Sequence, residues 1–186
     1  MFGFAYGEKE NGAVFSHMTV MYANALYQRG FIREGHKVLQ TLLDAAMNFE
    51  SSYMYPGLPE YFDSDGRGLY AYLTGAASWY MLTMITEVFG VRGDLGDLVI
   101  APSLLPEQFD EKGSAGLKLE FARKKFEIIM HNPEKKDLRI EQIRRAVCDE
   151  KVVLEPEPEY GVRLRKSVIE TLDPKKCHRI DVFFQE

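Results

Sequence analysis

The sequence predicts an α+β protein in which residues 1–93 contain the helices and residues 94–186 form an antiparallel β-sandwich. Apolar residues recur at three- and four-residue spacing in the first part, which is typical of helices packed on a core. Short alternating runs separated by charged turns dominate the second part. The 23 aromatic residues (10 Tyr, 12 Phe and 1 Trp) divide at the same boundary, because 17 of them lie within residues 1–93. A chain of 186 residues can bury a core in each of two small domains.

Helical spacing predicts a first helix over about Met18–Gln28 and a second over about Ile32–Met47. Ser16 is the expected N-cap of the first helix, because its hydroxyl can accept a hydrogen bond from a backbone N–H of the first turn. Gly30 lies between the two helices, which predicts an antiparallel helical hairpin.

A third helix is expected to begin at Gly75, with Thr74 as its N-cap and Gly90 just beyond its end. It is apolar around much of its circumference, which predicts packing on more than one side. The preceding segment, residues 49–73, contains two Pro, three Gly and seven aromatic residues without a sustained period. A long ordered loop of this kind is usually functional.

The second part of the sequence predicts short strands with charged turns between them. Residues 155–161 are expected to form one of these turns, and residues 162–176 are compatible with either a short helix or another strand. The expected strands cover Leu98–Ala101, Leu117–Arg123, Phe126–His131, Leu138–Val147, Lys151–Leu154 and Arg179–Phe184.

Composition disfavours several classes of function without excluding nucleic-acid binding, for which the chain offers no basic patch. With 23 Lys and Arg against 28 Asp and Glu, the net charge is −5, so we expect no nucleic-acid partner. No apolar run approaches the ~18 residues of a membrane span, and no secretory signal is visible, so a cytoplasmic location is expected. Cys148 and Cys177 have neither the spacing of a disulfide framework nor that of a zinc site, and no metal is expected.

Two predicted helix starts carry residues suited to binding an anion. His17 follows an Asn-Gly turn at the start of the first helix, where free backbone N–H groups favour negative charge. Thr74 and Gly75 occupy the start of the third helix, where a hydroxyl and closely approachable N–H groups can hold a phosphate. The alternative at each place is an ordinary helix start with locally satisfied side chains.

The loop PGLPEYFDSDGRG presents Glu60, Asp63 and Asp65 among aromatic residues. Paired carboxylates of this kind suit glycoside chemistry. A calcium loop beginning at Asp63 is disfavoured, because its twelfth position is Thr74 and not an acidic residue. A solvated loop is the third reading. Most of the nearby aromatic residues are expected to be core, and at most two or three to touch a sugar, the candidates being Tyr53, Tyr55, Tyr61, Phe62, Tyr70, Tyr72 and Trp79.

The ordered motifs NGAVFSH, LTGAASW and FGVRGDLGDLVIAPSLLP, with the helical hairpin and the Pro/Tyr-rich loop between them, resemble the C-terminal part of glycoside hydrolase family 94. This family contains inverting phosphorylases of cellobiose, chitobiose, cellodextrins and β-1,2-oligoglucans, and related modules occur in cyclic β-1,2-glucan synthases. The resemblance covers residues 1 to about 130. It implies the last helices of an (α/α)6 barrel in residues 1–93 and a β jelly-roll-like sandwich in residues 94–186.

The resemblance also implies a reaction and its partners. Phosphate attacks a β-linked glucosaccharide and inverts it to an α-sugar 1-phosphate, with inorganic phosphate as co-substrate and no other cofactor. By matching motifs, His17, Thr74 and Gly75 bind phosphate, and Glu60 and Tyr61 contact the substrate. The general acid, an Asp, belongs to an N-terminal part of the enzyme that this chain does not contain. That missing part is the expected partner, and a homodimer is a further one.

Two alternatives remain open at the level of the sequence. Besides a C-terminal part of a phosphorylase, the chain is compatible with a non-catalytic carbohydrate-binding module or with one polypeptide of a split enzyme. Exposed apolar area distinguishes them, because a severed barrel presents a large apolar face whereas a module that stands alone does not.

Overall fold

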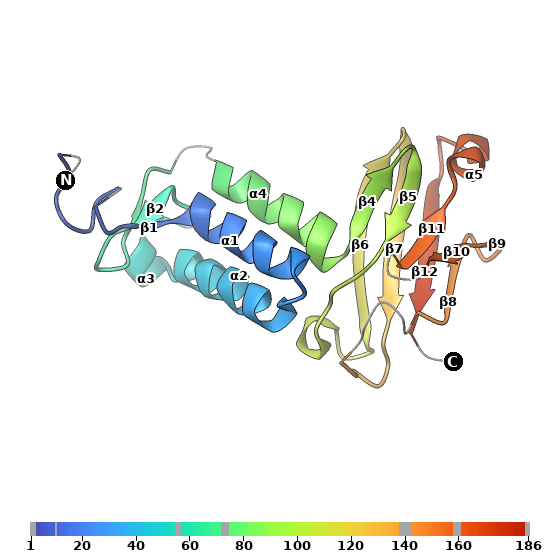
Figure 1. The fold of residues 1–186 in the computed structure, drawn as a ribbon, viewed down its shortest axis with the longest axis horizontal. Coiled ribbons are helices and arrows are strands. Elements are labelled where there is room, and N and C mark those ends of the chain that lie inside the picture. The colour runs from blue at the N-terminus through green and yellow to red at the C-terminus, as the bar shows by residue number, and fades with distance from the viewer. Residues whose placement is uncertain are drawn as a thin grey trace. The chain divides into compact units, whose positions relative to one another are not determined.

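The computed structural model describes residues 3–9, 11–54, 57–71, 75–137, 143–157 and 161–184. The fold is α+β, and the chain divides into two compact units, Met1–Met84 and Ile85–Glu186 (Figure 1). The boundary expected at residue 93 therefore lies inside the second unit. The reason is that strand β4 (Val91–Asp94) pairs along its whole length with β5 (Asp97–Ile100).

Unit 1 consists of helices and one small sheet. Helix α1 contacts both α2 and α4, and Figure 1 shows it between them. The described helices do not close a barrel. The strands pair in the antiparallel order β1–β2–β3. The elements are β1 (Val14–Phe15), α1 (Ser16–Gln28), α2 (Ile32–Met47), α3 (Phe49–Ser52), β2 (Tyr61–Phe62), β3 (Gly68–Leu69) and α4 (Gly75–Thr83), and a π-helical segment follows over Met84–Val88.

The structure confirms some of the predicted helix bounds and caps and contradicts others. The bounds of α2 are confirmed, and Gly30 between α1 and α2 has φ of +79°, which suits glycine. The assignment of Ser16 as an N-cap is wrong, because Phe15 occupies the cap and Ser16 is the first helical residue. Thr74 lies outside the described residues. The expected packing of the third helix on more than one side is also not observed, since Met81 and Leu82 are exposed.

The packing of α1 against its neighbours depends on one buried stripe. Val20 and Ala23 are fully buried, and Gly35 of α2 lies so close to Tyr27 that a Cβ there would be 2.7 Å from the ring. Glycine is thus required for the close approach of the two helices. On the other side, Asn24 Nδ2 donates a buried hydrogen bond to Thr83 Oγ1 at 3.1 Å, which sets the register of α4 on α1.

Unit 2 contains two sheets, with strand orders β10–β11–β5–β4 and β6–β7–β12–β8–β9. The first sheet is antiparallel throughout, but β12 pairs in parallel with β7, so the prediction of a wholly antiparallel sandwich is wrong. Parallel pairing requires a long connection, which β8 to α5 provide. The elements not yet delimited are β6 (Ser114–Phe121), β7 (Lys124–His131), β8 (Arg145–Cys148), β9 (Val152–Val153), β10 (Glu155–Glu157), β11 (Gly161–Leu164), α5 (Lys166–Thr171), β12 (Cys177–Phe183) and a 3₁₀ turn at Pro106–Gln108.

Both sheets supply fully buried side chains to the core of unit 2. The strand predicted over Phe126–His131 is confirmed as part of β7, in which the buried Phe126, Ile128 and Met130 alternate with more exposed residues. The first sheet adds Leu98 and Ile100 of β5. The start of the strand expected over 138–147 lies outside the described residues, and its end is β8.

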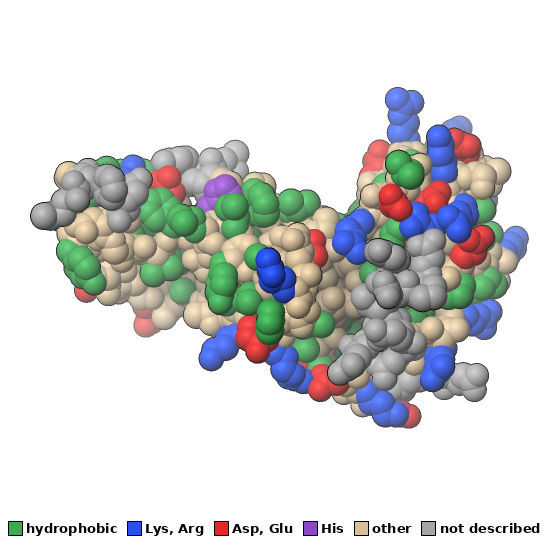
Figure 2. All heavy atoms as spheres, viewed as in Figure 1, with side chains coloured by type: hydrophobic (Ala, Val, Ile, Leu, Met, Phe, Trp, Pro, Cys, Tyr) green, Lys and Arg blue, Asp and Glu red, His purple; other side chains and the backbone are tan. Residues whose placement is uncertain are grey.

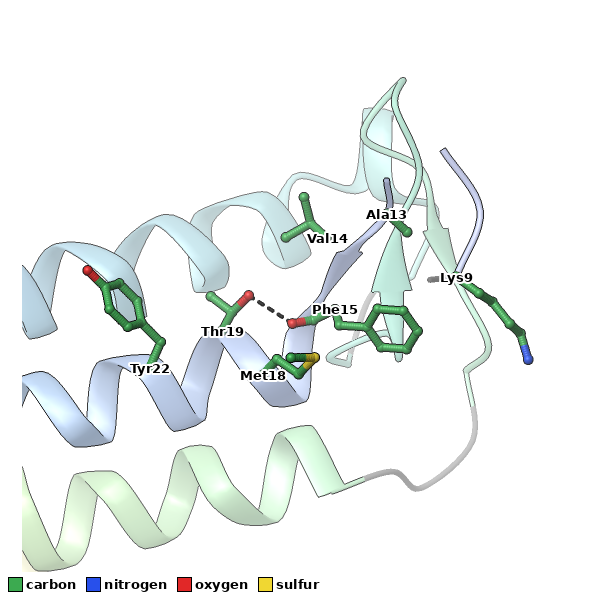
Figure 3. Close-up of a pocket in the computed structure, with 7 residues that line it drawn as sticks. All are labelled: Lys9, Ala13, Val14, Phe15, Met18, Thr19 and Tyr22. Carbon is green, nitrogen blue, oxygen red and sulfur yellow. Dashed lines mark hydrogen bonds between the residues drawn. The ribbon is translucent and has the colours of Figure 1, made fainter. Parts of the chain in front are cut away.

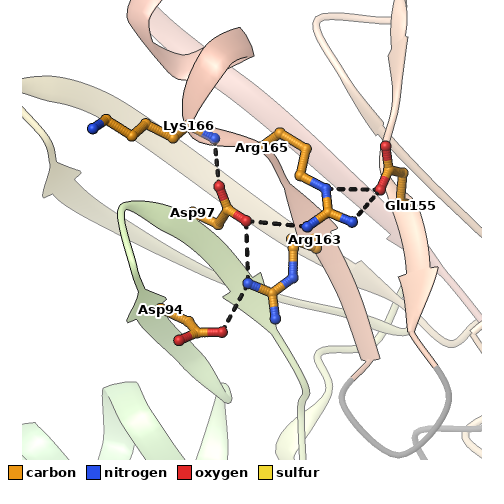
Figure 4. Close-up of polar contacts among 6 residues, drawn as sticks. All are labelled: Asp94, Asp97, Glu155, Arg163, Arg165 and Lys166. Carbon is orange, nitrogen blue, oxygen red and sulfur yellow. Dashed lines mark hydrogen bonds and ion pairs between the residues drawn. The ribbon is translucent and has the colours of Figure 1, made fainter.

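Strand β10 and helix α5 are where sequence and structure differ most. Residues 155–157 form a strand and not a turn, and the ambiguous segment 162–176 contains both a strand, β11, and a short helix, α5. An ion-pair network joins these elements to the turn between β4 and β5 (Figure 4). Arg163 bonds Asp94 at 2.9 Å and Asp97 at 3.2 Å, and Arg165 bonds Glu155 at 2.6 Å. Pairing between charged strands explains why apolar alternation missed β10.

Asp97 is the centre of this network. Its Oδ1 accepts the backbone N–H of Lys166 at 2.6 Å, and its Oδ2 accepts bonds from Arg163 and Arg165. The Lys166 N–H and then the two guanidinium groups hold the pKa of Asp97 below its ordinary value. The carboxylate therefore stays ionised and fixes the start of α5 beside the β4–β5 turn.

A second polar cluster surrounds His178 at the start of β12. His178 is 4% exposed, with Nδ1 at 2.6 Å from Asp149 Oδ2 and Nε2 at 2.9 Å from the carbonyl oxygen of Asp173. Both partners are acceptors, so both ring nitrogens must carry protons. Burial alone would lower the pKa of His178, but the bonds to Asp149 and Asp173 outweigh it and raise the pKa.

We expect the stability of the protein to fall as pH rises through the folded pKa of His178. Because the folded pKa is raised, the stabilisation is fully present below about pH 6.5, the ordinary pKa of histidine in an unfolded chain. Urea denaturation between about pH 6 and pH 9 measures the effect, with His178→Gln removing the pH-dependent step. His36→Gln on α2 is the matched control and should keep it. An identical pH dependence in His178→Gln and the wild type would contradict the assignment.

Candidate functional site

His17 is positioned by the strand that precedes it. Phe15 of β1 pairs with Tyr61 of β2, and the next residue, Ser16, donates its backbone N–H to the carbonyl oxygen of Glu60 at 2.9 Å. His17 follows as the second residue of α1. The segment FSH is therefore fastened by its backbone to the segment PEYF, although more than forty residues separate them in the chain.

Gly75, the first residue of α4, lies directly against His17. A Cβ at position 75 would be 2.6 Å from Cε1 and 2.7 Å from Nδ1 of His17, which no side chain tolerates. Trp79, one turn later on α4, also packs against the imidazole, with ring centroids 5.7 Å apart. The structure thus brings together two of the three phosphate-binding residues expected from the resemblance, and Thr74 lies outside the described residues.

The beginnings of α1 and α4 lie side by side. His17 meets Gly75 at one end, and Asn24 bonds Thr83 near the other, so the two helices run parallel. Each helix N-terminus carries free N–H groups and a partial charge of roughly +0.5. Two such ends at one place favour an anion more than either alone.

Two polar atoms at this place have no partner in the part of the chain that the structure describes. The Nε2 atom of His17 and the Oγ atom of Ser16 are buried without a hydrogen bond. A buried polar atom left unpaired costs about 1–3 kcal/mol, so a native protein normally supplies a partner. An anion that accepts a proton from His17 Nε2 would satisfy that atom. Sequence reasoning placed Ser16 only as a cap, and its position beside His17 was the available signal.

Glu60 and Tyr61 differ in their suitability for contact with a substrate. Glu60 is partly exposed and is held at the edge of the small sheet, where its N–H donates to the carbonyl oxygens of Leu69 and Tyr70. Tyr61 is 4% exposed, and its ring packs against Phe15 and Tyr70 at centroid distances of 5.6 and 5.7 Å. Burial, and then Tyr70, raises the pKa of Tyr61. The ring of Tyr61 therefore packs in the core of unit 1, and its contact with a substrate stays a prediction.

The other aromatic residues of the loop differ in their exposure to solvent. Tyr53 and Tyr70 are exposed, whereas Phe62 is buried; Tyr55 and Tyr72 lie outside the described residues.

Asp63 does not present a free carboxylate edge, because its Oδ1 accepts the backbone N–H groups of Asp65 and Arg67, each at 2.9 Å. Asp63 thus closes its own turn, as Asx residues commonly do.

Other chemistry is weakly represented in the described part of the chain. No group of three or more His, Cys, Asp or Glu side chains is arranged to hold a metal ion there. Burial raises the pKa of Cys148 to about 12, so its thiol is not a nucleophile near neutral pH. No helix among the described residues is both long enough and apolar enough to cross a membrane.

An apolar groove runs along α1 next to the site. The groove has a volume of about 670 Å³ and is lined by residues of β1 and α1, including Phe15, Met18 and Tyr22 (Figure 3). Met18 is 68% exposed, and Met21 is exposed beside it. Neither α1 nor α4 contains Asp, Glu, Lys or Arg. Apolar side chains accordingly gather over unit 1 in the space-filling view (Figure 2).

A search against protein-family models found no match to this chain, and a search of curated proteins found no significant similarity. The family resemblance therefore rests on the quoted sequence motifs and stays a prediction.

Replacing Gly75 with Ala should displace His17, because the added Cβ has no room beside the imidazole. Overpacking of this kind costs about 1–3 kcal/mol. Thermal denaturation measures the loss, and the ¹H–¹⁵N spectrum of the His17 ring reports its movement. Gly57→Ala is the matched control, since a Cβ there meets only the Met54 carbonyl oxygen at an ordinary 3.4 Å. Equal stability and an unchanged His17 signal in Gly75→Ala would refute the close contact.

Proposed function

We propose that the chain is the C-terminal part of an inverting glycoside phosphorylase and that it supplies the phosphate-binding site of that enzyme. The observation that carries the proposal is the buried Nε2 of His17, which has no hydrogen-bond partner among the described residues and lies beside the adjoining N-termini of α1 and α4. Phosphate provides several acceptor oxygens and a negative charge, which are what these donors and helix ends lack. The motifs that suggested the family place a phosphate here, and the packing of His17 on Gly75 supports that expectation.

In this proposal, phosphate attacks the anomeric carbon directly while an Asp of the missing N-terminal part protonates the leaving oxygen. The product is an α-sugar 1-phosphate from a β-linked glucosaccharide. Because the nucleophile is not part of the protein, catalysis depends on holding it in line with the bond that breaks. His17 packs against Gly75 and Trp79 of α4, and these contacts support a fixed position for the imidazole, which suits this task. Glu60, fastened next to His17 through the backbone, is the proposed contact with the sugar.

The exposed face of α1 supports a missing partner and disfavours a carbohydrate-binding module that stands alone. Met18, Met21, Tyr22 and Ala25 follow helical spacing on the side opposite the buried stripe. Each large apolar side chain that stays exposed forgoes about 1.5–3 kcal/mol of burial. We propose that the N-terminal part of the same enzyme covers this face, either in one polypeptide or as a second chain of a split enzyme. The (α/α)6 barrel and the jelly-roll-like arrangement belong to this proposal.

The direct test is the phosphate dependence of the complete enzyme. We expect His17→Ala and Thr74→Ala each to raise the apparent KM for phosphate about tenfold or more, because they remove bonds to an anion. The KM for the saccharide should change little. Initial rates of α-sugar 1-phosphate release at varied phosphate concentrations measure this, with His36→Ala on α2 as the control. An unchanged dependence of the rate on phosphate concentration in His17→Ala would contradict the assignment of His17 to the phosphate-binding site.

The exposed face of α1 predicts that the isolated chain associates with itself. Met18→Glu together with Tyr22→Lys should reduce the association constant at least about tenfold, because burial of two apolar side chains is lost. Sedimentation velocity over a range of concentrations measures this. Leu95→Glu with Val153→Lys is the matched control, since it adds the same charges at exposed apolar positions of unit 2. A monodisperse wild-type monomer with a cooperative melt would instead favour a stand-alone binding module.

A further inference from the structure

Unit 2 contains a pocket that the proposed function does not use. It has a volume of about 410 Å³ and lies where the β6–β7 turn, helix α5 and the β4–β5 turn meet. Figure 2 shows Lys and Arg side chains, with acidic ones among them, at the end of unit 2 where Figure 1 places α5. The wall of the pocket is mostly apolar, and its polar side chains are charged. The pocket is lined by Gly96, Ala122, Arg123, Lys124, Lys166, Ile169, Glu170 and Pro174.

The cations around the pocket are only partly neutralised. Lys124 Nζ donates to the carbonyl oxygen of Leu172, and Lys166 Nζ lies 3.8 Å from Glu170. Arg123 makes no ion pair or hydrogen bond with the residues that the structure describes. Three positive charges against one negative charge leave a net charge of about +2 at the pocket, in a chain whose net charge is −5.

The backbone holds these cations in place. The N–H of Lys166 is bound by Asp97 at 2.6 Å, within the ion-pair network of Figure 4. Arg123 and Ala122 form the two-residue turn between β6 and β7 with φ of +62° and +49°, a conformation that costs about 1 kcal/mol for a residue other than glycine. The turn therefore retains an arginine at a position where glycine would be more stable.

We propose that this pocket binds a small phosphate monoester, with the phosphate at the cations and a compact apolar body against Ile169 and Pro174. A phosphate monoester carries about −1.5 to −2 charges at pH 7, which matches the net charge of the pocket, whereas a monocarboxylate does not. The guanidinium fork of Arg123 suits phosphate oxygens, and Lys124 has donors beyond the one given to Leu172. A volume of about 410 Å³ is ordinary for a small-molecule site. This inference does not depend on the proposed phosphorylase function.

Titration of the full chain with phenyl phosphate tests the proposal. Calorimetry gives the affinity, and ¹H–¹⁵N spectra locate the binding. We expect a dissociation constant of roughly 1 mM, as the size of the ligand allows, and weaker binding of inorganic phosphate. Arg123→Gly and Lys166→Gln should each weaken binding about fivefold, the loss of one charge-assisted contact. Arg123→Gly also removes the unfavourable positive φ of a residue other than glycine, so we expect this variant to fold.

Lys125→Gln is the matched control, because Lys125 is exposed next to Lys124 but does not line the pocket. His17→Ala is titrated in parallel, since the proposed phosphate site in unit 1 is an independent place for the ligand. Binding retained in His17→Ala and weakened in Arg123→Gly supports the pocket. Wild-type affinity in Arg123→Gly and Lys166→Gln overturns it. Loss confined to His17→Ala also overturns it, while leaving the proposed function intact.

Discussion

The pairing of β1 with β2 is the constraint on which the candidate site depends. The backbone bond from Ser16 to Glu60 extends this pairing by one residue and ends where α1 begins. His17 follows directly, and its side chain packs against Gly75 and Trp79 of α4. Strand pairs of two residues are weak alone, but here Phe15 and Tyr61 pack their rings together on the same pairing. The position of His17 thus depends on three chain segments together, β1, β2 and the start of α4.

Helix α1 has apolar residues on two opposite sides, one buried within unit 1 and one exposed. Its buried stripe organises unit 1, and Asn24 at the far end sets how α4 lies against it. Its other side carries Met18, Met21 and Tyr22 in the open. A helix that is apolar on opposite sides and lacks charge is normally enclosed by neighbours. The same helix therefore links the proposed phosphate site to the proposed partner, because the partner would cover the helix whose beginning holds His17.

Polar clusters replace apolar packing as the organising feature at the edges of unit 2. Asp97 joins the start of α5 to the β4–β5 turn, and His178 joins the β8–β9 turn to the loop before β12. Both clusters link segments that are distant in sequence. Removing one member of such a cluster leaves the others unpaired, which costs more than the net gain of the bond itself. The pocket beside Arg123 has its shape because Asp97 fixes Lys166 there.

Local pattern determined much of the secondary structure, because helix period and strand alternation depend on residues within a few positions of one another. The α+β class, the bounds of α2 and the strand at Phe126–His131 followed from it. The same reasoning placed His17 and Gly75 at helix starts. It could not show that these starts touch, since that depends on α1 and α4 running parallel. Nor could it find β10, the parallel pairing of β7 with β12 or the burial of Tyr61. Those features depend on partners far along the chain, which only the tertiary structure brings together.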